Sequence, residues 1–320
     1  MPLIYNGVTV TAVTYNGVSL SSLVYNGVTV WQGLPTIGIF YAGATSTGYD
    51  ISTVNTVTRV NSSNALVAAQ TTTGTSRRFL SGAGLGNTAM YRGDVGYAGI
   101  ITRLNINGVL VGSESSNSSA GRAATGAASV GAVVVFYAGL TANLTFTNQV
   151  LRLEESGAQV GTVTSVGTSR SALAGVPLDQ VALFYGGISA NQTYRNTTTR
   201  INESGASLGS ETSIGSSRSG LGGGRATSLG VFYAGSGGSF RSSVTTAINS
   251  SGAQVGSQSA ASVSRMGVAG CQVGENASFY GGTSGQAIYN NLAQINSSLA
   301  QVGNDSTIGT ARYNLGGASL

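Results

Sequence analysis

The sequence predicts an all-β protein, with a six-bladed β-propeller over residues 35–320 and a small β-hairpin or meander segment over residues 1–34. Three observations carry this prediction. A unit of 46 to 50 residues recurs six times, each unit offers four short apolar runs between turn residues, and the last unit supplies the run that the first unit lacks.

Residues 1–34 repeat the tetrapeptide YNGV at intervals of ten residues, beginning at Tyr5, Tyr15 and Tyr25. Asn-Gly between alternating apolar residues is the strongest short hairpin signal. So few residues bury too little surface to be stable alone. We therefore expect Tyr5, Tyr15, Tyr25 and Trp31 to anchor this segment on another chain or a larger assembly.

Each later unit carries a tyrosine that ends an apolar run, followed closely by glycine, as in IFYAG and LFYGG. This is typical of a buried strand that enters a turn. An arginine stands 14 or 15 residues before the tyrosine wherever both occur, and a strand is expected after it. The tyrosines are Tyr41, Tyr91, Tyr137, Tyr185, Tyr233 and Tyr280, and the arginines are Arg77, Arg122, Arg170, Arg218, Arg265 and Arg312.

A third landmark follows each tyrosine, as in RLNINGVLVG and RINESGASLG. Two β runs flank a turn rich in Asn, Ser and Gly, which predicts a hairpin. Each unit then has four strands, the number in a propeller blade. The first unit starts at TIGIFYAG without an arginine strand and the chain stops at ARYNLGGASL, so the C-terminal strand should complete the first blade and close the ring.

The stretch SRMGVAGCQVGENASFYGG, residues 264–282, resembles the repeats of kelch-type β-propellers, and this resemblance covers nearly all of residues 35–320. The chain departs from the kelch pattern in two ways. The family's characteristic tryptophan is absent from every repeat, and the diglycine stands only at Gly186 with Gly187 and at Gly281 with Gly282. The resemblance implies a divergent kelch-like ring and no particular activity.

The composition argues against most kinds of catalytic and metal-binding site. The chain has no histidine, which removes the commonest metal ligand and neutral-pH acid or base. Cys271 is the one cysteine, so an internal disulfide is excluded, and we expect a buried side chain there. Glu154 and Glu155 are adjacent at a turn and are interpreted as a solvated turn. We therefore predict no enzyme, with no catalytic residue, metal or cofactor.

The charge pattern also limits the partners. The net charge is +5, but the 15 cationic residues are all arginines spread along the chain with no basic block, so no nucleic-acid partner is expected. No apolar run is long enough for a spanning helix, and no signal peptide is recognised at the start. The expectation is a protein without a membrane span.

Two sets of repeated residues are candidates for binding. The six arginines should stand at one mouth of the central channel, where they either bind anions or hydrogen-bond carbonyls of the adjoining blade, and we favour the structural role. Aromatic residues recur in the polar loop after each tyrosine strand, where they either bind a glycan or cap the blade core. They are Tyr49, Tyr97, Phe146, Tyr194, Phe240 and Tyr289.

One glycine-rich stretch, SRSGLGGGRATSLGVFYAG at residues 217–235, could cradle a phosphate. Such a cradle leads from a strand into a helix, and no helical pattern follows here. Its glycines are expected instead in an innermost strand, where backbones approach closely.

The tandem YNG segments resemble terminal segments of bacteriophage tail and fibre proteins. This resemblance implies a virion structural protein, such as a tail fibre, tail tip or capsid decoration, made in the host cytoplasm and exposed on the particle. Its partners would be other virion proteins, further copies of the chain, with a trimer as our guess, and a host cell-surface glycan for receptor binding. The alternatives are a lectin-like bacterial scaffold and, third, a glycan-cleaving propeller enzyme.

Overall fold

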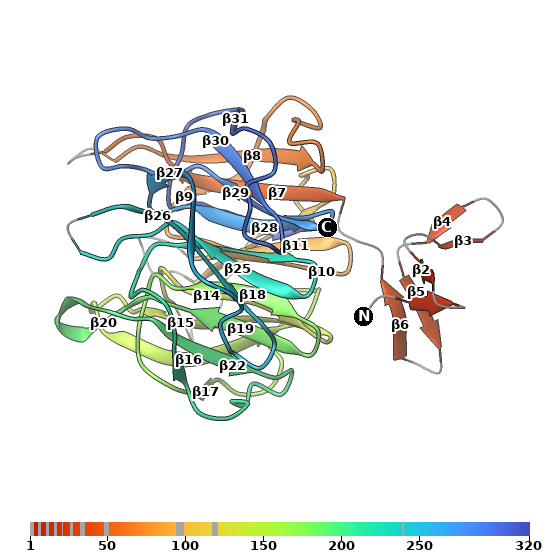
Figure 1. The fold of residues 1–320 in the computed structure, drawn as a ribbon, viewed down its shortest axis with the longest axis horizontal. Coiled ribbons are helices and arrows are strands. Elements are labelled where there is room, and N and C mark those ends of the chain that lie inside the picture. The colour runs from red at the N-terminus through yellow and green to blue at the C-terminus, as the bar shows by residue number, and fades with distance from the viewer. Residues whose placement is uncertain are drawn as a thin grey trace.

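The structure, a computed structural model, describes the backbone of six short strands within residues 3–32 and both backbone and side chains of residues 36–47, 51–93, 99–116, 121–238 and 240–320. Six four-stranded antiparallel sheets form the blades of a β-propeller (Figure 1). The all-β class and the number of blades predicted from the sequence are confirmed.

We number the blades along the chain and give the strands of each from the axis outward. Blade 1 contains β32 (Gly316–Ser319), β7 (Ile37–Ala44), β8 (Thr53–Asn61) and β9 (Thr71–Arg77). Blade 2 contains β10 (Ser81–Leu85), β11 (Thr88–Arg92), β12 (Ile100–Asn105) and β13 (Ser115–Ser116). Blade 3 contains β14 (Gly126–Val130), β15 (Val133–Leu140), β16 (Phe146–Leu153) and β17 (Thr164–Ser165).

Blade 4 contains β18 (Ala174–Leu178), β19 (Val181–Tyr185), β22 (Thr197–Ile201) and β23 (Thr212–Ser213). Blade 5 contains β24 (Gly222–Ala226), β25 (Leu229–Tyr233), β26 (Ser242–Ile248) and β27 (Ser259–Arg265). Blade 6 contains β28 (Ala269–Val273), β29 (Asn276–Tyr280), β30 (Asn291–Ile295) and β31 (Ser306–Thr307).

The C-terminal strand closes the ring, as predicted. β32 pairs with β7 in antiparallel register, with Gly316 opposite Tyr41. Each inner strand contacts the inner strands of both neighbouring blades, in the cyclic order β32, β10, β14, β18, β24 and β28. The first and last parts of the ring are thereby joined in one blade, which leaves no open end to the array of blades.

Small residues allow the inner strands to approach closely. The fifth residue after each repeated arginine is glycine in five blades and Ala127 in blade 3. A Cβ atom added to Gly223 would lie 2.8 Å from the carbonyl oxygen of Gly175, and one added to Gly270 would lie 2.5 Å from that of Gly223. The stretch GLGGGRA therefore forms inner strand β24 and its approach, as predicted, and leads into a second strand.

The ring has two faces. The loop face carries the loops that join the second strand of each blade to the third, and the turn face carries the tight turns between first and second strands. β7 runs from the turn face at Ile37 to the loop face at Ala44. The Thr36 N–H donates to the carbonyl of Leu320 at 3.0 Å, so the chain enters the ring from residues 1–35 at the turn face.

The core lies between the blades, where aromatic rings pair. Tyr137 of blade 3 contacts Phe184 of blade 4 with ring centroids 5.1 Å apart. The same tilted contact at 5.2 Å joins Tyr185 to Phe232, Tyr233 to Phe279, Tyr280 to Phe40, and Tyr41 to Tyr91. The repeated tyrosine thus joins neighbouring blades as well as ending a strand.

The outer strands differ from the prediction. The second run of the predicted hairpin, such as VLVG in blade 2, makes only the single bridge between Leu104 and Leu110. The outer strand β13 follows later and has two residues. The Asn-rich turn is fixed by its own side chain, because Asn105 Oδ1 accepts from the N–H groups of Asn107 and Val109, and the chain then leaves the sheet before it pairs again.

The N-terminal segment forms three separate two-stranded hairpins. The pairs are β1 (Leu3–Tyr5) with β2 (Val8–Val10), β3 (Val13–Tyr15) with β4 (Val18–Leu20), and β5 (Ser22–Tyr25) with β6 (Val28–Gln32). The predicted hairpins are confirmed, whereas within these strands no pairing joins one hairpin to the next as a meander would require. The side chains of Tyr5, Tyr15, Tyr25 and Trp31 lie outside the described residues.

Candidate functional site

The six repeated arginines, which we call the strap arginines, lie between neighbouring blades. Each has an exposed fraction of 0 or 1%. The main chain of Arg170 is held by blade 3, since its N–H donates to the Thr147 carbonyl at 3.0 Å and its carbonyl accepts from Gly139 at 2.8 Å. Its guanidinium lies 5.7 Å from the centroid of the Tyr137 ring.

The side chain of each strap arginine is held by the following blade. In Arg170, Nη1 donates to the carbonyls of Gly186 and Thr197 at 3.0 and 2.9 Å. Equivalent pairs of carbonyls accept from the Nη1 atoms of the other five. In the order Arg77, Arg122, Arg218, Arg265 and Arg312, the pairs are Gly93 and Ile100, Ala138 and Gln149, Ala234 and Val244, Gly281 and Asn291, and Ala42 and Thr56. Each strap arginine therefore links two blades.

This placement corrects the expected position of the arginines at a channel mouth. Their guanidinium groups are buried and hydrogen-bonded to main-chain carbonyls, so an anion in solvent does not reach them. The reason is that the side chain turns outward between blades, toward the second and third strands, instead of inward to the axis. Burial lowers the pKa of Arg122 to about 9, with a further contribution from the charge of Arg92, and the group still carries its proton at neutral pH.

Two strap arginines also pair with a carboxylate. Arg77 Nη2 lies 3.2 Å from Glu114 Oε1, and Arg170 Nη2 lies 3.5 Å from Glu211 Oε1. Burial acts to raise the pKa of the Glu211 carboxyl, but hydrogen bonds from Thr168 and Thr199 and the charge of Arg170 hold the pKa below its usual value. In blades 1 and 5 a glutamine stands in place of the glutamate. Gln70 is hydrogen-bonded to the hydroxyl groups of Thr58 and Thr310, and Gln258 to those of Ser216 and Thr246.

A belt of main-chain hydrogen bonds surrounds the axis on the loop face. The second residue after each strap arginine has a left-handed φ between +52° and +66°: Phe79, Ala124, Ala172, Gly220, Gly267 and Asn314. From Ala124 to Asn314, the N–H of each of these residues donates to the carbonyl of the equivalent residue in the preceding blade, at 2.7 to 3.1 Å. Leu80 N–H donates to the Asn314 carbonyl at 3.4 Å and closes the belt.

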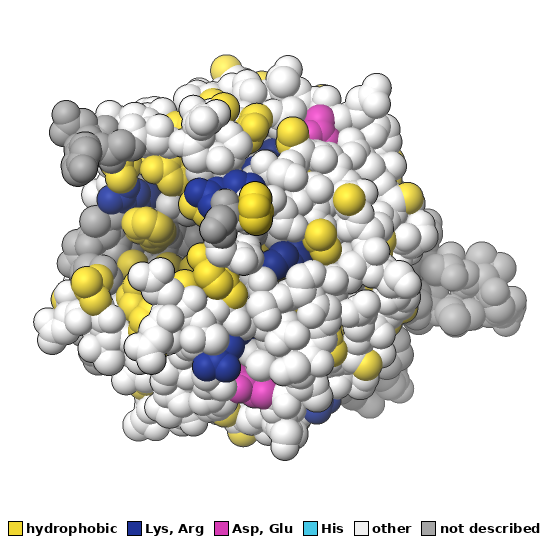
Figure 2. Space-filling view, turned by 60° about the vertical axis from the view of Figure 1, so that its left-hand side comes forward, with side chains coloured by type: hydrophobic (Ala, Val, Ile, Leu, Met, Phe, Trp, Pro, Cys, Tyr) yellow, Lys and Arg dark blue, Asp and Glu magenta, His cyan; other side chains and the backbone are white. Residues whose placement is uncertain are grey.

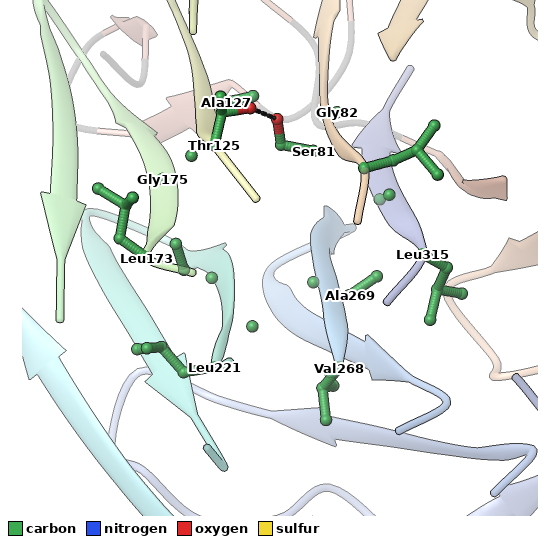
Figure 3. Close-up of a pocket in the computed structure, with 18 residues that line it drawn as sticks. Ser81, Gly82, Thr125, Ala127, Leu173, Gly175, Leu221, Val268, Ala269 and Leu315 are labelled. Atoms are coloured by element: carbon green, nitrogen blue, oxygen red, sulfur yellow. Dashed lines mark hydrogen bonds between the residues drawn. The ribbon is translucent and has the colours of Figure 1, made fainter. Parts of the chain in front are cut away.

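The central channel is narrow. Its cavity has a volume of about 60 Å³ and is lined by the beginnings of all six inner strands, at residues 80–82, 125–127, 173–175, 221–223, 268–270 and 315–317 (Figure 3). The lining is glycine, alanine, leucine and valine together with Ser81 and Thr125, whose hydroxyl groups are hydrogen-bonded at 2.6 Å. It has room for a few water molecules and not for a sugar.

The loop face, by contrast, is exposed and carries its own charges. Arg78, Arg195 and Arg241 lie there half-buried, and none of them forms an ion pair within the described part of the chain. Figure 2 brings this side forward and shows arginine and hydrophobic side chains gathered on it, while acidic side chains appear at the upper right and in the lower part of the view, the latter beside an arginine.

The described acids lie elsewhere. Glu154, Glu155, Asp179, Glu203 and Glu275 belong to turns of the turn face, and Glu114, Glu211 and Asp305 precede outer strands. Asp50 and Asp94 lie outside the described residues. The five acids of the turn face are therefore separated in space from Arg78, Arg195 and Arg241, and no described acid forms an ion pair with these arginines.

Four of the six predicted loop aromatics can be placed, all on the loop face. Phe240 is 82% exposed, whereas Phe146, Tyr194 and Tyr289 are half-buried. Tyr194 belongs to β21 (Thr193–Tyr194), which pairs with β20 (Ile188–Ser189) in a small hairpin. Exposure of Phe240 argues against a capping role for that ring. Tyr49 and Tyr97 lie outside the described residues.

The remaining sequence-based candidates have structural surroundings. Cys271 is buried in an apolar cluster, and burial raises the pKa of its thiol well above the usual value. Glu155 is more than a solvated turn residue, because its Oε1 accepts from the Asn87 N–H at 2.9 Å and from the Thr88 hydroxyl at 3.0 Å in blade 2. A hairpin acid of blade 3 thus joins the neighbouring blade.

Sequence reasoning did not single out Arg78, Arg195 or Arg241. Arg195 and Arg241 directly follow two of the loop aromatics, and this aromatic-arginine pair is the signal that was present in the sequence. No group of three or more Cys, Asp or Glu side chains that could hold a metal ion occurs within the described ranges. None of the helical structure in the described ranges is long and apolar enough to cross a membrane. No protein-family model matches the chain, and no curated protein matches it.

Proposed function

We propose that this protein is a non-enzymatic structural component of a bacteriophage virion that attaches by residues 1–34 and displays the loop face of its propeller to a host-surface glycan. A tail fibre, a tail tip and a capsid decoration are the forms that this role takes. The resemblances of the YNG segments to phage tail proteins and of the blades to kelch repeats motivate the proposal.

One observation carries it. The N-terminal segment joins the ring at the turn face, where Thr36 and Ile37 bond to Leu320, and the aromatic loops stand at the other end of β7 (Figure 1). A chain that is anchored by its N-terminal segment would therefore present its loops away from the anchor.

The loop face supports recognition of a sugar. Exposed Phe240 and half-buried Tyr194 and Tyr289 offer flat apolar surfaces, and the loops around them are rich in Ser, Thr, Asn and Gln. Loops on a rigid scaffold are common sites of binding. The narrow channel favours binding on this face over binding along the axis.

A glycan array tests the recognition half of the proposal. The full chain should bind a bacterial surface polysaccharide, and Tyr194→Ala or Tyr289→Ala should weaken that binding at least about tenfold, since a buried aromatic contact contributes on the order of 1.4 kcal/mol or more. Val255→Ala on the turn face is the control. Unchanged binding in both tyrosine variants would remove these loops from the site.

A second experiment tests attachment. The chain should copurify with phage particles, and it should form multimers, a trimer on our expectation, that dissociate when residues 1–34 are deleted. A monomeric ring found free of particles would favour the alternative of a lectin-like bacterial scaffold. Release of sugar products from a bound polysaccharide would contradict a non-enzymatic role.

A further inference from the structure

Two neighbouring blades repeat an aromatic-arginine pair on the loop face. Blade 4 carries Tyr194 followed by Arg195, and blade 5 carries Phe240 followed by Arg241. A serine of the same loop steadies each arginine. Arg195 Nε donates to Ser189 Oγ at 2.8 Å, and Arg241 Nη1 donates to Ser236 Oγ at 3.3 Å.

The serine contacts leave much of each guanidinium fork available. In Arg195 only Nε is used by that contact, and in Arg241 only Nη1. Both arginines are half-buried, so part of each side chain reaches solvent, although Nε of Arg241 is buried. This differs from the strap arginines, whose Nη1 atoms each donate to two main-chain carbonyls.

The charge of these arginines is not balanced locally. Neither arginine has a carboxylate within ion-pair distance among the residues that the structure describes. Arg225 on the turn face provides the contrast, since its Nη2 lies 3.1 Å from Asp179 Oδ1. A guanidinium without a carboxylate partner is suited to an incoming carboxylate or phosphate, which it binds through parallel N–H groups.

Arg241 also reaches toward the next blade. A Cβ atom added to Gly285 in blade 6 would lie 3.4 Å from Arg241 Nη2. Gly285 has a φ of +97°, which a residue with a side chain rarely adopts. The glycine therefore leaves open the space beside this guanidinium, at the junction of the loops of blades 5 and 6.

The aromatic rings add an apolar surface beside the charge. Phe240 is 82% exposed, so its ring offers apolar surface to a partner. A pyranose ring presents an apolar C–H face that packs against such a ring, and its acidic substituent extends to the side. Because Tyr194 directly precedes Arg195 and Phe240 directly precedes Arg241, each of the two loops carries an aromatic ring and a cation together.

We propose that the loops of blades 4, 5 and 6 bind an acidic glycan, with its carboxylate or phosphate on Arg195 and Arg241 and a sugar face on Tyr194 and Phe240. This inference rests on the proposed glycan-binding function and specifies its ligand class. Carboxylate-bearing and phosphate-bearing polymers share the recognised chemistry, and the experiment separates them.

The test compares matched polymers on immobilised full-length protein. Polygalacturonate is paired with its methyl ester, and poly(glycerol phosphate) is paired with dextran. At least one acidic polymer should bind about tenfold or more tightly than its neutral counterpart, because charge-assisted hydrogen bonds contribute about 1.5–3 kcal/mol. Which acidic polymer binds identifies the anion. Binding should weaken as sodium chloride rises from about 50 to 200 mM.

Three variants assign the contacts. Arg195→Gln and Arg241→Gln should each weaken binding of the acidic polymer about tenfold, for the same reason. Phe240→Ala, at an exposed position where folding is little affected, should weaken binding of acidic and neutral polymers alike. Arg225→Gln on the turn face is the matched control and should bind as the unchanged chain does. Equal thermal unfolding midpoints would show that the loop variants remain folded.

The outcomes separate this inference from the proposed function. The acidic-glycan inference would be overturned if the neutral polymer bound as strongly as the acidic one, or if host cells were bound, and neither Arg195→Gln nor Arg241→Gln weakened that binding. Glycan binding itself would then remain in place. Absence of binding to every polymer and to host cells would overturn both.

Discussion

At the scale of single residues, the strap arginines show how the ring accommodates buried charge. A buried guanidinium is costly unless its N–H groups are satisfied. In Arg170 the two carbonyls and the Thr199 hydroxyl accept from the two Nη atoms, and the Glu211 carboxylate lies 3.5 Å from Nη2. Arginine suits this position because its planar fork reaches acceptors on two strands at once, which a lysine ammonium cannot match.

Arg170→Lys should therefore destabilise the ring. We expect a loss of about 2–4 kcal/mol in the free energy of unfolding, because at least two buried carbonyls lose a donor. Arg200→Lys, at a half-buried position in β22 of blade 4, is the control and should cost less than about 0.5 kcal/mol. Urea denaturation measures both. Equal small losses in the two variants would contradict the strap role.

The Glu211 carboxyl predicts a dependence on acid. Its pKa in the folded protein is lowered, so the folded state binds fewer protons than the unfolded state near pH 4. The contribution to stability is fully present above the ordinary carboxyl pKa of about 4.3 and is lost as pH falls through the folded value.

Glu211→Gln should make unfolding less sensitive to pH between about pH 5 and 3. Glutamine fits at this place, since Gln258 occupies the corresponding position in blade 5. Exposed Glu154 supplies the control substitution Glu154→Gln. Denaturation midpoints measured across this pH range check the prediction. If the midpoint of Glu211→Gln fell with pH as steeply as those of Glu154→Gln and the unchanged chain, the role of the Glu211 carboxyl would be refuted.

At the scale of elements, the inner strands set the dimensions of the ring. Their first residues crowd around a cavity of about 60 Å³, and a carbonyl of one strand faces the glycine Cα of the next. The left-handed residues after the strap arginines hold the same strands in a closed belt. The small inner-strand residues and the belt of hydrogen bonds therefore both hold the inner strands close together.

Gly223→Ala tests this crowding. The added methyl group would lie 2.8 Å from the Gly175 carbonyl oxygen and 2.9 Å from Val176 Cγ2, so the strands must separate. Overpacking of this kind costs about 1–3 kcal/mol. Ser213→Ala, at an exposed outer strand, is the control. Thermal unfolding at neutral pH should show a lower midpoint for Gly223→Ala alone.

The sequence was sufficient for the inner and second strands and insufficient for the outer ones. The interval of 14 or 15 residues from arginine to tyrosine is filled by two strands and a tight turn, which leaves little freedom. The apolar run after each Asn-rich turn looks like a strand, but in the fold it makes one bridge. The direction of each strap arginine depends on contacts between blades, which spacing along one chain does not reveal.

The candidate site was only partly predictable for a similar reason. The loop aromatics are visible because they recur at one place in each unit. The separation of Glu203 from Arg195 is invisible in the sequence, because Glu203 stands only eight residues from Arg195 and yet lies on the opposite face. Antiparallel strands carry sequence neighbours to opposite ends of a blade.

At the scale of the whole molecule, closure of the ring by β32 also fixes which face the N-terminal segment enters. β32 completes blade 1, so the two ends of the ring meet beside the entry point of the N-terminal segment. The same arrangement places the three half-buried arginines and the loop aromatics on the face away from that entry point. Under the proposed function, the turn face would serve attachment and the loop face would serve recognition.

Two truncations separate these roles. Removal of residues 315–320 takes away an inner strand and exposes the edge of β7, so the cooperative thermal transition should be lost and aggregation should follow. Removal of residues 1–33 should leave the midpoint of that transition unchanged. A ring that kept its full midpoint without β32 would contradict closure by the C-terminal strand.

The most direct test of the proposed recognition role is a hydrogen-exchange footprint of the full chain with the acidic polysaccharide that binds it most tightly. We predict slower amide exchange at residues 188–195, 236–238 and 283–289 on the loop face. Exchange at residues 86–88, 131–133 and 179–181 on the turn face should be unchanged. Protection confined to the turn face would contradict recognition through the loops.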